Sequence, residues 1–345
     1  MDSLTPEKVR PLSLMDLGVN TAPPATLDEF FQYEEEGGDT KPDTLPETNE
    51  LLRDVRAALD MGYAGVILSG PPGTGKSWYA KRLAHTLAEN VDAVRIVQFH
   101  ASYQYEDFML GFAPSDGGGF HLQKKTFALM CDDAAERPTV LHVLLIDEIS
   151  RCDVARVFGE ALTYIEMDKR GQEFTVASGG KMAVPPNLVI LATMNPWDKG
   201  VDELDIALER RFAQIDVLPS RIDLRHLLEA NDATAEIVNR VERFFDAVQR
   251  EQNEVVRLGH AYFLSCVDDA SARRAWEFSL KPFFRKACRL DKATLERVML
   301  AWLREFPAPV IVPAATPQSL GSEGGGNGLP AAQDVVPSPQ IAPAT

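Results

Sequence analysis

The sequence predicts an α/β fold, in which a parallel sheet lies between layers of helices, followed by a unit built of helices alone. Two patterns predict it. Up to about residue 218, short runs rich in Val, Ile and Leu alternate with helical segments, and strands that are apolar on both faces are typical of a covered parallel sheet. Beyond that point, apolar side chains recur at the i, i+3, i+4 spacing of helices.

Length and composition narrow the class of protein. A chain of 345 residues with 45% hydrophobic content is long enough for about two folded units. Its formal net charge of -16 argues against a surface that binds nucleic acid or an anionic membrane throughout, because such binding needs an excess of Lys and Arg. The four cysteines form no CxxC pair, which favours reduced thiols. Since no run of about 18 apolar residues and no signal peptide is evident, we expect a cytoplasmic protein with no membrane partner.

The elements of the α/β part follow in order along the chain. Residues 1–45 are rich in Pro, Thr, Asp and Glu and predict an acidic, flexible segment. A helical spacing over 46–62 then leads into the run YAGVILSG, which predicts the first strand. The later apolar runs predict three further strands, over 93–100, 140–148 and 187–195. Between them, the sequence predicts a hairpin with a following helix over 117–137 and a second hairpin over 171–184.

The helical unit follows the α/β core, which we expect over 46–218. Four segments inside 219–306 have the apolar spacing of helices, over 221–230, 234–252, 271–288 and 292–306. The remaining residues, 307–345, are dominated by Ala, Pro, Gly and Ser and predict a disordered tail.

A phosphate-binding pattern follows the first predicted strand. The stretch GPPGTGKS has a glycine, four residues and then Gly-Lys-Ser, and it opens a predicted helix. Glycines let successive N–H groups point at phosphate oxygens, next to the positive end of the helix. Lys76 would bridge the β- and γ-phosphates, and the Ser77 hydroxyl would bind Mg²⁺. The expected nucleotide-binding residues are Gly70, Pro71, Pro72, Gly73, Thr74, Gly75, Lys76 and Ser77.

An acidic pair ends the strand expected over 140–148. Asp147 at this edge can hold Mg²⁺ through water, and Glu148 can orient and deprotonate the water that attacks the γ-phosphate. Aspartate alone would support binding, whereas the added glutamate supports hydrolysis. A helix cap with two solvated carboxylates is the other interpretation.

An asparagine and two arginines complete the candidate site. Asn195 ends a strand and is expected at the same sheet edge, within reach of the γ-phosphate or the attacking water, although it could simply begin a turn before Pro196. Arg210 and Arg211 come too far along the chain to share that edge easily. One of them would stabilise transition-state charge in a neighbouring subunit, unless it only pairs with an acidic residue on its own helix.

The order of these features resembles the AAA+ ATPases, and more narrowly their McrB type. The resemblance covers residues 60 to about 290 and rests on the stretches VQFHASYQYEDFMLGFAP, IDEISRCDVARVFGEALTYIEMDKRG, ALERRF and LGHAYF. It implies the P-loop NTPase fold of AAA+ proteins, a three-layer α/β sandwich with a helical lid. It also implies that Lys76, Ser77, Asp147, Glu148 and Asn195 form one subunit's site, and that Arg210 or Arg211 acts in trans in a homo-oligomer, usually a hexameric ring. The segment EMDKRG is then expected near the subunit interface.

The resemblance has one departure, at the residues after the third predicted core strand. The chain has MNPWDKG from residue 194, whose Asn-Pro is closer to the MoxR-like relatives. We therefore expect ATP, with GTP as the alternative. No nuclease site or DNA-reading domain is evident, so target reading and cutting, and any nucleic-acid contact, are expected of separate partner subunits.

Three functions remain open on the sequence. The leading hypothesis is an NTPase that drives translocation or remodelling in a McrB-like defence system. The second keeps the motor but gives it the client of a MoxR-like chaperone, which remodels protein complexes or assists metal insertion. The third is a nucleotide-gated assembly scaffold with little turnover. Glu148 argues against this function, because a glutamate at that position supports hydrolysis.

Overall fold

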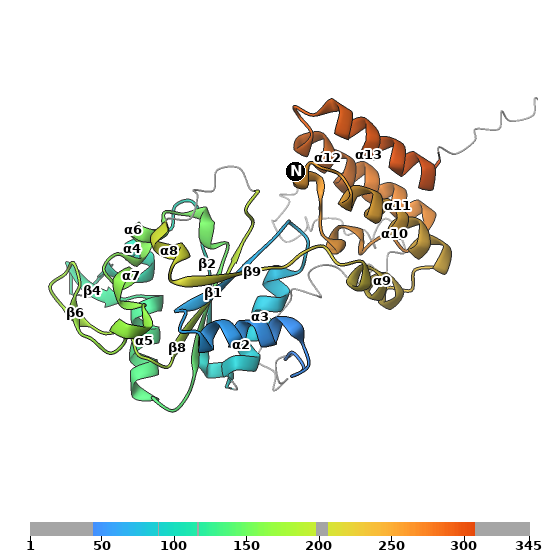
Figure 1. Cartoon of the computed structure of the whole chain (residues 1–345). Coiled ribbons are helices and arrows are strands. Elements are labelled where there is room, and N and C mark those ends of the chain that lie inside the picture. Colours follow the sequence, from blue (N-terminus) through green and yellow to red (C-terminus); the bar gives the residue numbers. More distant parts are fainter. Residues whose placement is uncertain (1–43, 89, 116, 198–205, 308–345) are drawn as a thin grey trace, which may run out of the picture. The chain divides into compact units, whose positions relative to one another are not determined.

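A five-stranded parallel sheet forms the centre of the α/β part of the computed structural model, which describes residues 44–88, 90–115, 117–197 and 206–307 (Figure 1). The strands run in the order β2-β5-β8-β1-β9, and each neighbouring pair is parallel. Because all five strands point the same way, the residues that follow them meet at one edge of the sheet. The strands are β1 (Gly65–Ser69), β2 (Val94–Gln98), β5 (His142–Asp147), β8 (Leu188–Met194) and β9 (Phe212–Asp216).

Apolar cores on both faces of the sheet explain why its central strands are continuous apolar runs. Every residue of β1 and β8 is buried. Val66 and Leu68 of β1 belong to the core shared with helices α2 (Glu50–Asp60) and α3 (Lys76–Ala88), whereas Ile67 belongs to the opposite core, shared with α5 (Thr126–Glu136). The sheet is therefore the middle layer of a three-layer sandwich.

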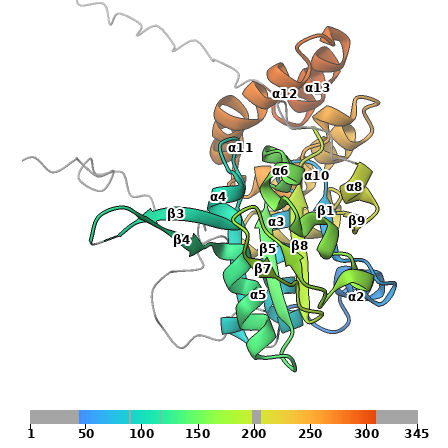
Figure 2. The same cartoon turned by 90° about the vertical axis from the view of Figure 1, so that its left-hand side faces the viewer.

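The connections between strands carry short helices and two antiparallel hairpins. The first hairpin pairs β3 (Leu110–Pro114) with β4 (Phe120–Lys124) and extends away from the sheet (Figure 2). The second pairs β6 (Phe174–Thr175) with β7 (Lys181–Met182). The short helices and turns are η2 (Val91–Ala93), α4 (Tyr105–Phe108), η3 (Ile149–Arg151), α6 (Val154–Phe158), α7 (Ala161–Tyr164), η4 (Met167–Lys169) and α8 (Ile206–Glu209).

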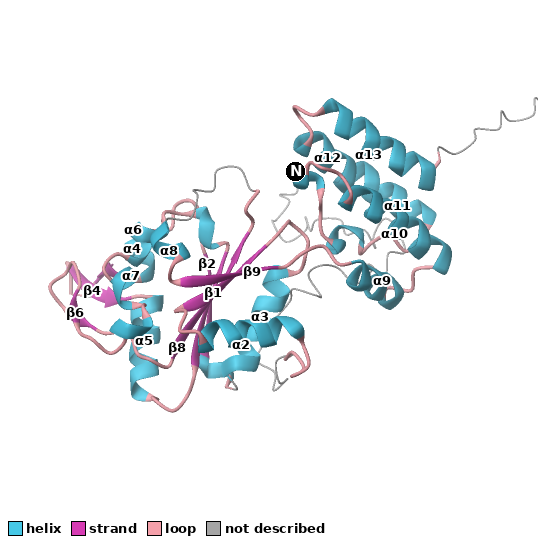
Figure 3. Ribbon diagram, in the orientation of Figure 1, coloured by secondary structure: helices cyan, strands magenta, loops and turns pink. Residues whose placement is uncertain are grey.

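After β9, the described residues form helices only (Figure 3). Their core is rich in aromatic side chains: the ring of Trp302 stacks on Trp276 at 4.5 Å and on Phe306 at 4.1 Å between ring centroids. The helices are α9 (Arg221–Ala230), α10 (Ala235–Gln249), α11 (Asp269–Ala275), α12 (Lys281–Ala287) and α13 (Lys292–Glu305), with the short turns η5 (Glu254–Val256), η6 (His260–Phe263) and the π-helical turn η7 (Trp276–Leu280).

The predicted fold class is confirmed, with differences at the two edge strands. β9 is a fifth strand, which is not among the four that the sequence predicts. After the buried Phe212, its residues alternate between half-buried and exposed positions, so they give a weaker apolar signal than a central strand does. β2 is predicted as an apolar strand, yet it lies at the other edge, and the side chain of Ile96 is 45% exposed.

Several expectations lie partly or wholly outside the described residues. They are the flexible segment expected over 1–45, of which 1–43 are not described, and the tail, of which 308–345 are not described. The boundaries at 46–218 and 219–306 stay predictions. Within the described ranges, no helix has both the length and the apolar character needed to cross a bilayer, and all four cysteines are free and buried.

Candidate functional site

Residues 70–77 form a tight loop between β1 and α3. Gly73 and Gly75 have φ angles of +79° and +81°, which glycine adopts without the penalty that a side chain would add. Gly70 has a different constraint, because a Cβ atom there would lie 2.2 Å from the carbonyl oxygen of Val217. These glycines let the chain turn into the N-terminus of α3, where free N–H groups and the helix dipole favour an anion.

Two polar side chains of the loop are bonded to its own backbone. The Lys76 ammonium is buried and donates to the carbonyl oxygen of Pro71 at 2.8 Å. The Thr74 hydroxyl donates to the same oxygen at 3.1 Å. The positive charge of Lys76 is thereby kept against the loop, where it can act on a bound phosphate.

Three side chains meet beyond the loop, at the carboxyl edge of the sheet. The Ser77 hydroxyl donates to Asp147 Oδ1 at 2.8 Å, and the Thr193 hydroxyl donates to the same oxygen at 2.5 Å. Thr193 Oγ1 also accepts from the backbone N–H of Glu148 at 3.0 Å. Thr193 therefore joins both members of the acidic pair. Sequence reasoning missed this residue, although a hydroxyl in the otherwise apolar strand LVILATM is a usable signal.

The oxygen atoms of Ser77 and Asp147 fit Mg²⁺ rather than a softer metal. Magnesium prefers oxygen ligands and is commonly held by one or two protein groups together with phosphate oxygens. Among the described residues, no group of three or more His, Cys, Asp or Glu side chains could hold a metal ion alone. A cation at this edge would therefore share its coordination with a nucleotide.

Glu148 has an unusual backbone. Its φ and ψ are +58° and +49°, a left-handed conformation that is rare for residues other than glycine and is often found at functional sites. Its carboxylate lies 3.3 Å from the guanidinium of Arg151, and its side chain is 24% exposed. The strained turn directs the chain away from β5 just after Asp147.

Asn195 lies at the same edge, next to the phosphate loop. It is buried and directly follows β8, whose last residue, Met194, accepts a hydrogen bond from the N–H of Gly70 at 3.3 Å. Its Oδ1 accepts from the Trp197 N–H at 3.2 Å, so the amide nitrogen is the group oriented to donate elsewhere. Two of the residues that depart from the McrB pattern, 199 and 200, lie outside the described part of the chain.

Arg210 and Arg211 lie at the opposite edge of the sheet. The Arg211 carbonyl accepts from the Ala64 N–H at 2.8 Å, and the parallel register then pairs Phe212 with Gly65. Both arginines thus stand beside the start of β1, whereas the phosphate loop follows its end. Five residues of strand separate the two positions, which is about 16 Å.

Glu166 brings the two arginines together. Its Oε1 lies 2.7 Å from Arg211 and 2.9 Å from Arg210, and its Oε2 lies 2.6 Å from Lys169. The hydrogen bond from Lys169 and the charges of the arginines lower the pKa of Glu166. The Arg211 side chain is 5% exposed and that of Arg210 is 64% exposed. The structure thereby separates a buried arginine from an accessible one, which the sequence cannot do.

This cluster borders a surface pocket of about 370 Å³, lined by Gly62, Ala64, Glu166, Met167, Asp168, Arg210 and Arg211. Within the segment EMDKRG, Arg170 does not line the pocket. It turns inward and donates to the carbonyl oxygens of Pro185 and Leu188 at 2.9 and 2.7 Å, and burial lowers its pKa to about 10. This segment therefore combines a buried anchor with a polar surface.

The segment LGHAYF lies against the phosphate loop. The N–H groups of Gly259 and Ala261 donate to the carbonyl oxygens of Pro72 and Gly73, both at 2.9 Å. A Cβ atom on Gly73 would lie 2.6 Å from the ring of Tyr262. Part of the helical region therefore borders the candidate site.

Comparison with known proteins agrees with this arrangement. The family model "AAA domain (dynein-related subfamily)" matches residues 65–212, which hold strands β1, β2, β5 and β8 of the sheet, the loop and the arginine pair. These residues form an AAA domain. The chain is also 31% identical over 276 residues to the EcoKMcrB subunit of a type IV methyl-directed restriction enzyme from Escherichia coli strain K12. It is 27% identical over 188 residues to the YdiS component of the type II restriction enzyme BsuMI from Bacillus subtilis strain 168.

The two alignments cover 75% and 43% of this chain, respectively. They span 59% of the length of the EcoKMcrB subunit and 55% of the length of YdiS. Sequence similarity thus relates this chain to AAA domains and to the EcoKMcrB subunit. The resemblance inferred from the motifs is confirmed.

Proposed function

We propose that this chain is a nucleoside triphosphatase that hydrolyses ATP, with GTP as the alternative, together with Mg²⁺. The loop over 70–77 would bind the phosphates through its N–H groups, and Lys76 would neutralise the charge of the β- and γ-phosphates. Ser77 and Asp147 would hold the cation, whose charge stabilises the leaving phosphates. The hydrogen bonds that join Ser77, Asp147 and Thr193 support this assignment.

Glu148 and Asn195 would act on the attacking water. The carboxylate of Glu148 would accept a proton from the water as it attacks the γ-phosphorus, and the amide nitrogen of Asn195 would orient the water or the γ-phosphate. Their place at the carboxyl ends of neighbouring strands β5 and β8 supports these roles. The pairing of Glu148 with Arg151 then has to loosen for the carboxylate to reach the water.

One observation carries the proposal that the enzyme works as an oligomer. Arg210 is exposed, but it lies about 16 Å of strand away from its own phosphate loop, which is more than an arginine side chain spans. A catalytic arginine there would act on the γ-phosphate of a neighbouring subunit. We assign this role to Arg210 and a positioning role to the buried Arg211, which holds Glu166 beside it. We propose a homo-oligomeric ring, for which the McrB resemblance implies six subunits.

At the level of the cell, we propose a motor subunit of a McrB-like restriction system. Two relatives named as components of restriction enzymes support this role. A separate partner subunit would read and cut nucleic acid, while this chain would convert hydrolysis into translocation or remodelling.

Mixing two inactive variants tests the trans arginine. Lys76→Ala removes the phosphate contact within a subunit, and Arg210→Ala removes the contact offered to the neighbour. We expect each variant alone to lose about a thousandfold or more in kcat, since a trans arginine contributes that much in related reactions. Mixed in equal amounts, they should hydrolyse ATP well above the sum of the two alone, because some interfaces combine an intact Lys76 with an intact Arg210.

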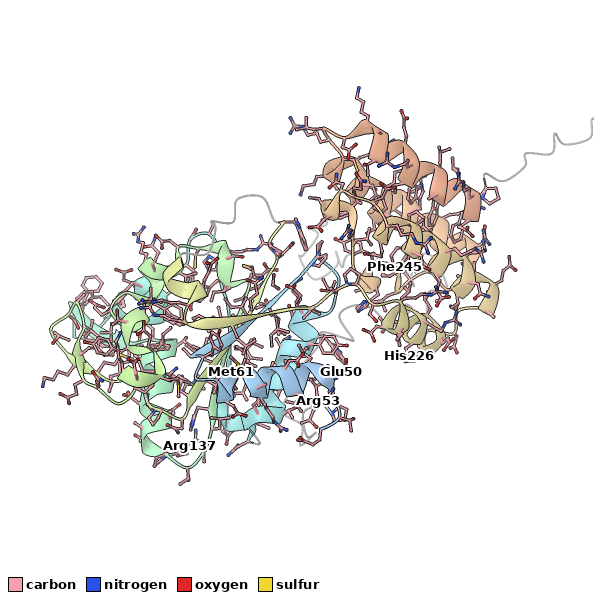
Figure 4. All side chains as sticks on the ribbon, in the orientation of Figure 1. Glu50, Arg53, Met61, Arg137, His226 and Phe245 are labelled. Carbon is pink, nitrogen blue, oxygen red and sulfur yellow. The ribbon has the colours of Figure 1, made fainter. Side chains whose placement is uncertain are left out.

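Arg53→Ala is the matched control, because Arg53 is also an exposed arginine and lies on α2, away from the phosphate loop and from Arg210 (Figure 4). It should hydrolyse ATP like the wild type. Mixtures that stay inactive although Arg210→Ala binds nucleotide and the two variants assemble would argue against a trans arginine. Wild-type hydrolysis no faster than that of Glu148→Gln would instead favour the assembly scaffold.

A further inference from the structure

The strongest unexplained feature of the described residues is a buried histidine beside the phosphate loop. His260 begins the turn η6 (His260–Phe263) and is 5% exposed. Its Nδ1 is buried and has no hydrogen-bond partner among the described residues. Its Nε2 lies 3.8 Å from the position that a Cβ atom on Gly75 would occupy. Buried polar nitrogens are nearly always paired. A buried imidazole with an unpaired Nδ1, whose Nε2 lies against the phosphate loop, therefore points to a missing ligand atom.

The backbone around His260 is fixed to the loop in a way that leaves phosphate binding free. Gly259 and Ala261 donate to carbonyl oxygens of the loop, so they do not occupy the N–H groups that a phosphate needs. The approach is too close for a side chain, because a Cβ atom on Gly259 would lie 2.1 Å from the carbonyl carbon of Gly73. The imidazole is therefore held at a set position relative to the loop.

The neighbours of His260 favour a neutral ring that can donate one hydrogen bond. Burial lowers the pKa of His260, and the carboxylate of Asp223 on α9 opposes this effect. The Tyr79 hydroxyl lies 3.5 Å from Asp223 Oδ2, and the Tyr79 ring packs 3.6 Å from the Cβ position of Gly75. Tyr79 and His260 thus both lie next to Gly75. A neutral imidazole carries one N–H donor and one acceptor.

We propose that His260 binds the nucleotide, by donating a hydrogen bond from its imidazole to a phosphate oxygen held at Gly75. This inference rests on the proposed nucleotide site. The N–H groups around Gly75 and Lys76 are the part of such a loop that cradles the α- and β-phosphates. His260 would therefore contribute equally to binding of nucleoside diphosphates and triphosphates, whereas Asn195 and Glu148 face the γ-phosphate.

The test compares two substitutions of His260 by their affinity for fluorescent ADP and ATP analogues. His260→Leu keeps a buried side chain of similar size but removes the donor, and His260→Gln keeps an N–H donor. We expect His260→Leu to raise Kd by about tenfold or more for both analogues, by the same factor, because a hydrogen bond to a charged phosphate is lost. His260→Gln should recover most of the affinity.

His226→Leu is the matched control, since His226 is an exposed histidine on α9 (Figure 4); its Kd should equal that of the wild type. Unchanged binding by His260→Leu would overturn the proposal, and so would a loss confined to ATP. If His260→Leu and His260→Gln lose equal affinity and show equal drops in Tm without nucleotide, the role of His260 is packing. That result would overturn the proposal too. If wild type and His226→Leu bind neither analogue, the proposed function itself fails.

Discussion

Thr193 shows how much of the candidate site depends on a residue with no catalytic chemistry of its own. One hydroxyl donates to the carboxylate of Asp147 and accepts from the N–H of Glu148. Glu148 is thereby held in its left-handed conformation, just after the strand that carries Asp147. The geometry of both acidic groups is therefore set from the neighbouring strand β8.

Thr193→Val tests this positioning role, because valine keeps the shape but removes the hydroxyl. We expect kcat for ATP hydrolysis to fall about tenfold or more, since the Glu148 N–H loses its acceptor and Asp147 loses a donor. KM should change by less than about threefold, because the phosphate loop is untouched. Thr193→Ser keeps the hydroxyl and should stay near wild type. A Thr193→Val enzyme with unchanged kcat would contradict the role.

Helices α9 and α10 are joined by a buried acidic residue. Glu242 on α10 is 1% exposed and accepts hydrogen bonds from Arg221 and Arg225, both on α9, at 3.0 and 2.8 Å. Burial by itself raises the pKa of Glu242, but the hydrogen bonds and charges of the two arginines outweigh it and lower the pKa. The contact fixes α9, which faces His260, to the rest of the helical core.

Glu242→Gln should weaken this contact at neutral pH. We expect the free energy of unfolding to fall by about 1–3 kcal/mol at pH 7, a modest loss because both arginines are partly exposed. The folded pKa of Glu242 lies below its ordinary value of 4.5, so its contribution is present above pH 4.5 and is lost as the pH falls through the folded pKa.

Urea titrations between pH 7 and pH 3 measure both effects. The wild type should lose more stability than Glu242→Gln as the pH falls below 4.5, so the two curves should converge. Parallel curves over this range would contradict the assignment. Glu236→Gln, at an exposed position of the same helix, is the matched control and should follow the wild type.

Elements with a strong periodic signal could be predicted from the sequence, and contacts between distant segments could not. Helix α9 begins and ends where the apolar spacing places it, and the central strands β1, β5 and β8 match the apolar runs. The predicted hairpin is present, but its first strand lies before the glycines, over Leu110–Pro114. Edge strand β9 was missed because two of its five residues are exposed and only one is buried.

The candidate site also has a part that could be predicted from the sequence and a part that could not. The loop and the acidic pair could be predicted because each is a short, contiguous motif with its own chemistry. By contrast, Glu166 is 44 residues from Arg210, and Thr193 is 46 residues from Asp147. Only the folded chain brings these side chains together, so no local pattern separates Arg210 from Arg211. The hydroxyl in the apolar run LVILATM singles out Thr193, but the sequence does not show which groups it contacts.

At the scale of the whole molecule, the sheet separates the candidate nucleotide-binding residues from the exposed arginine. The phosphate loop, Asp147, Glu148 and Asn195 gather at its carboxyl edge, and Arg210 stands at its amino edge. If Arg210 acts on a neighbouring subunit as proposed, an isolated subunit lacks one of the groups needed for fast hydrolysis. We expect ATPase activity per subunit to rise with protein concentration, which a dilution series followed by light scattering would measure. Constant specific activity on dissociation to monomers would contradict this.

Strand β9 connects those two edges within five residues. Arg210 lies just before its start, and at its far end the carbonyl of Val217 lies against Gly70, the first residue of the phosphate loop. A push on Arg210 by a neighbour's nucleotide would thus be transmitted along a stiff, hydrogen-bonded strand to the subunit's own loop. Adjacent sites would then hydrolyse nucleotide in sequence rather than independently. A few inactive subunits would therefore lower the activity of the assembly by more than their own share.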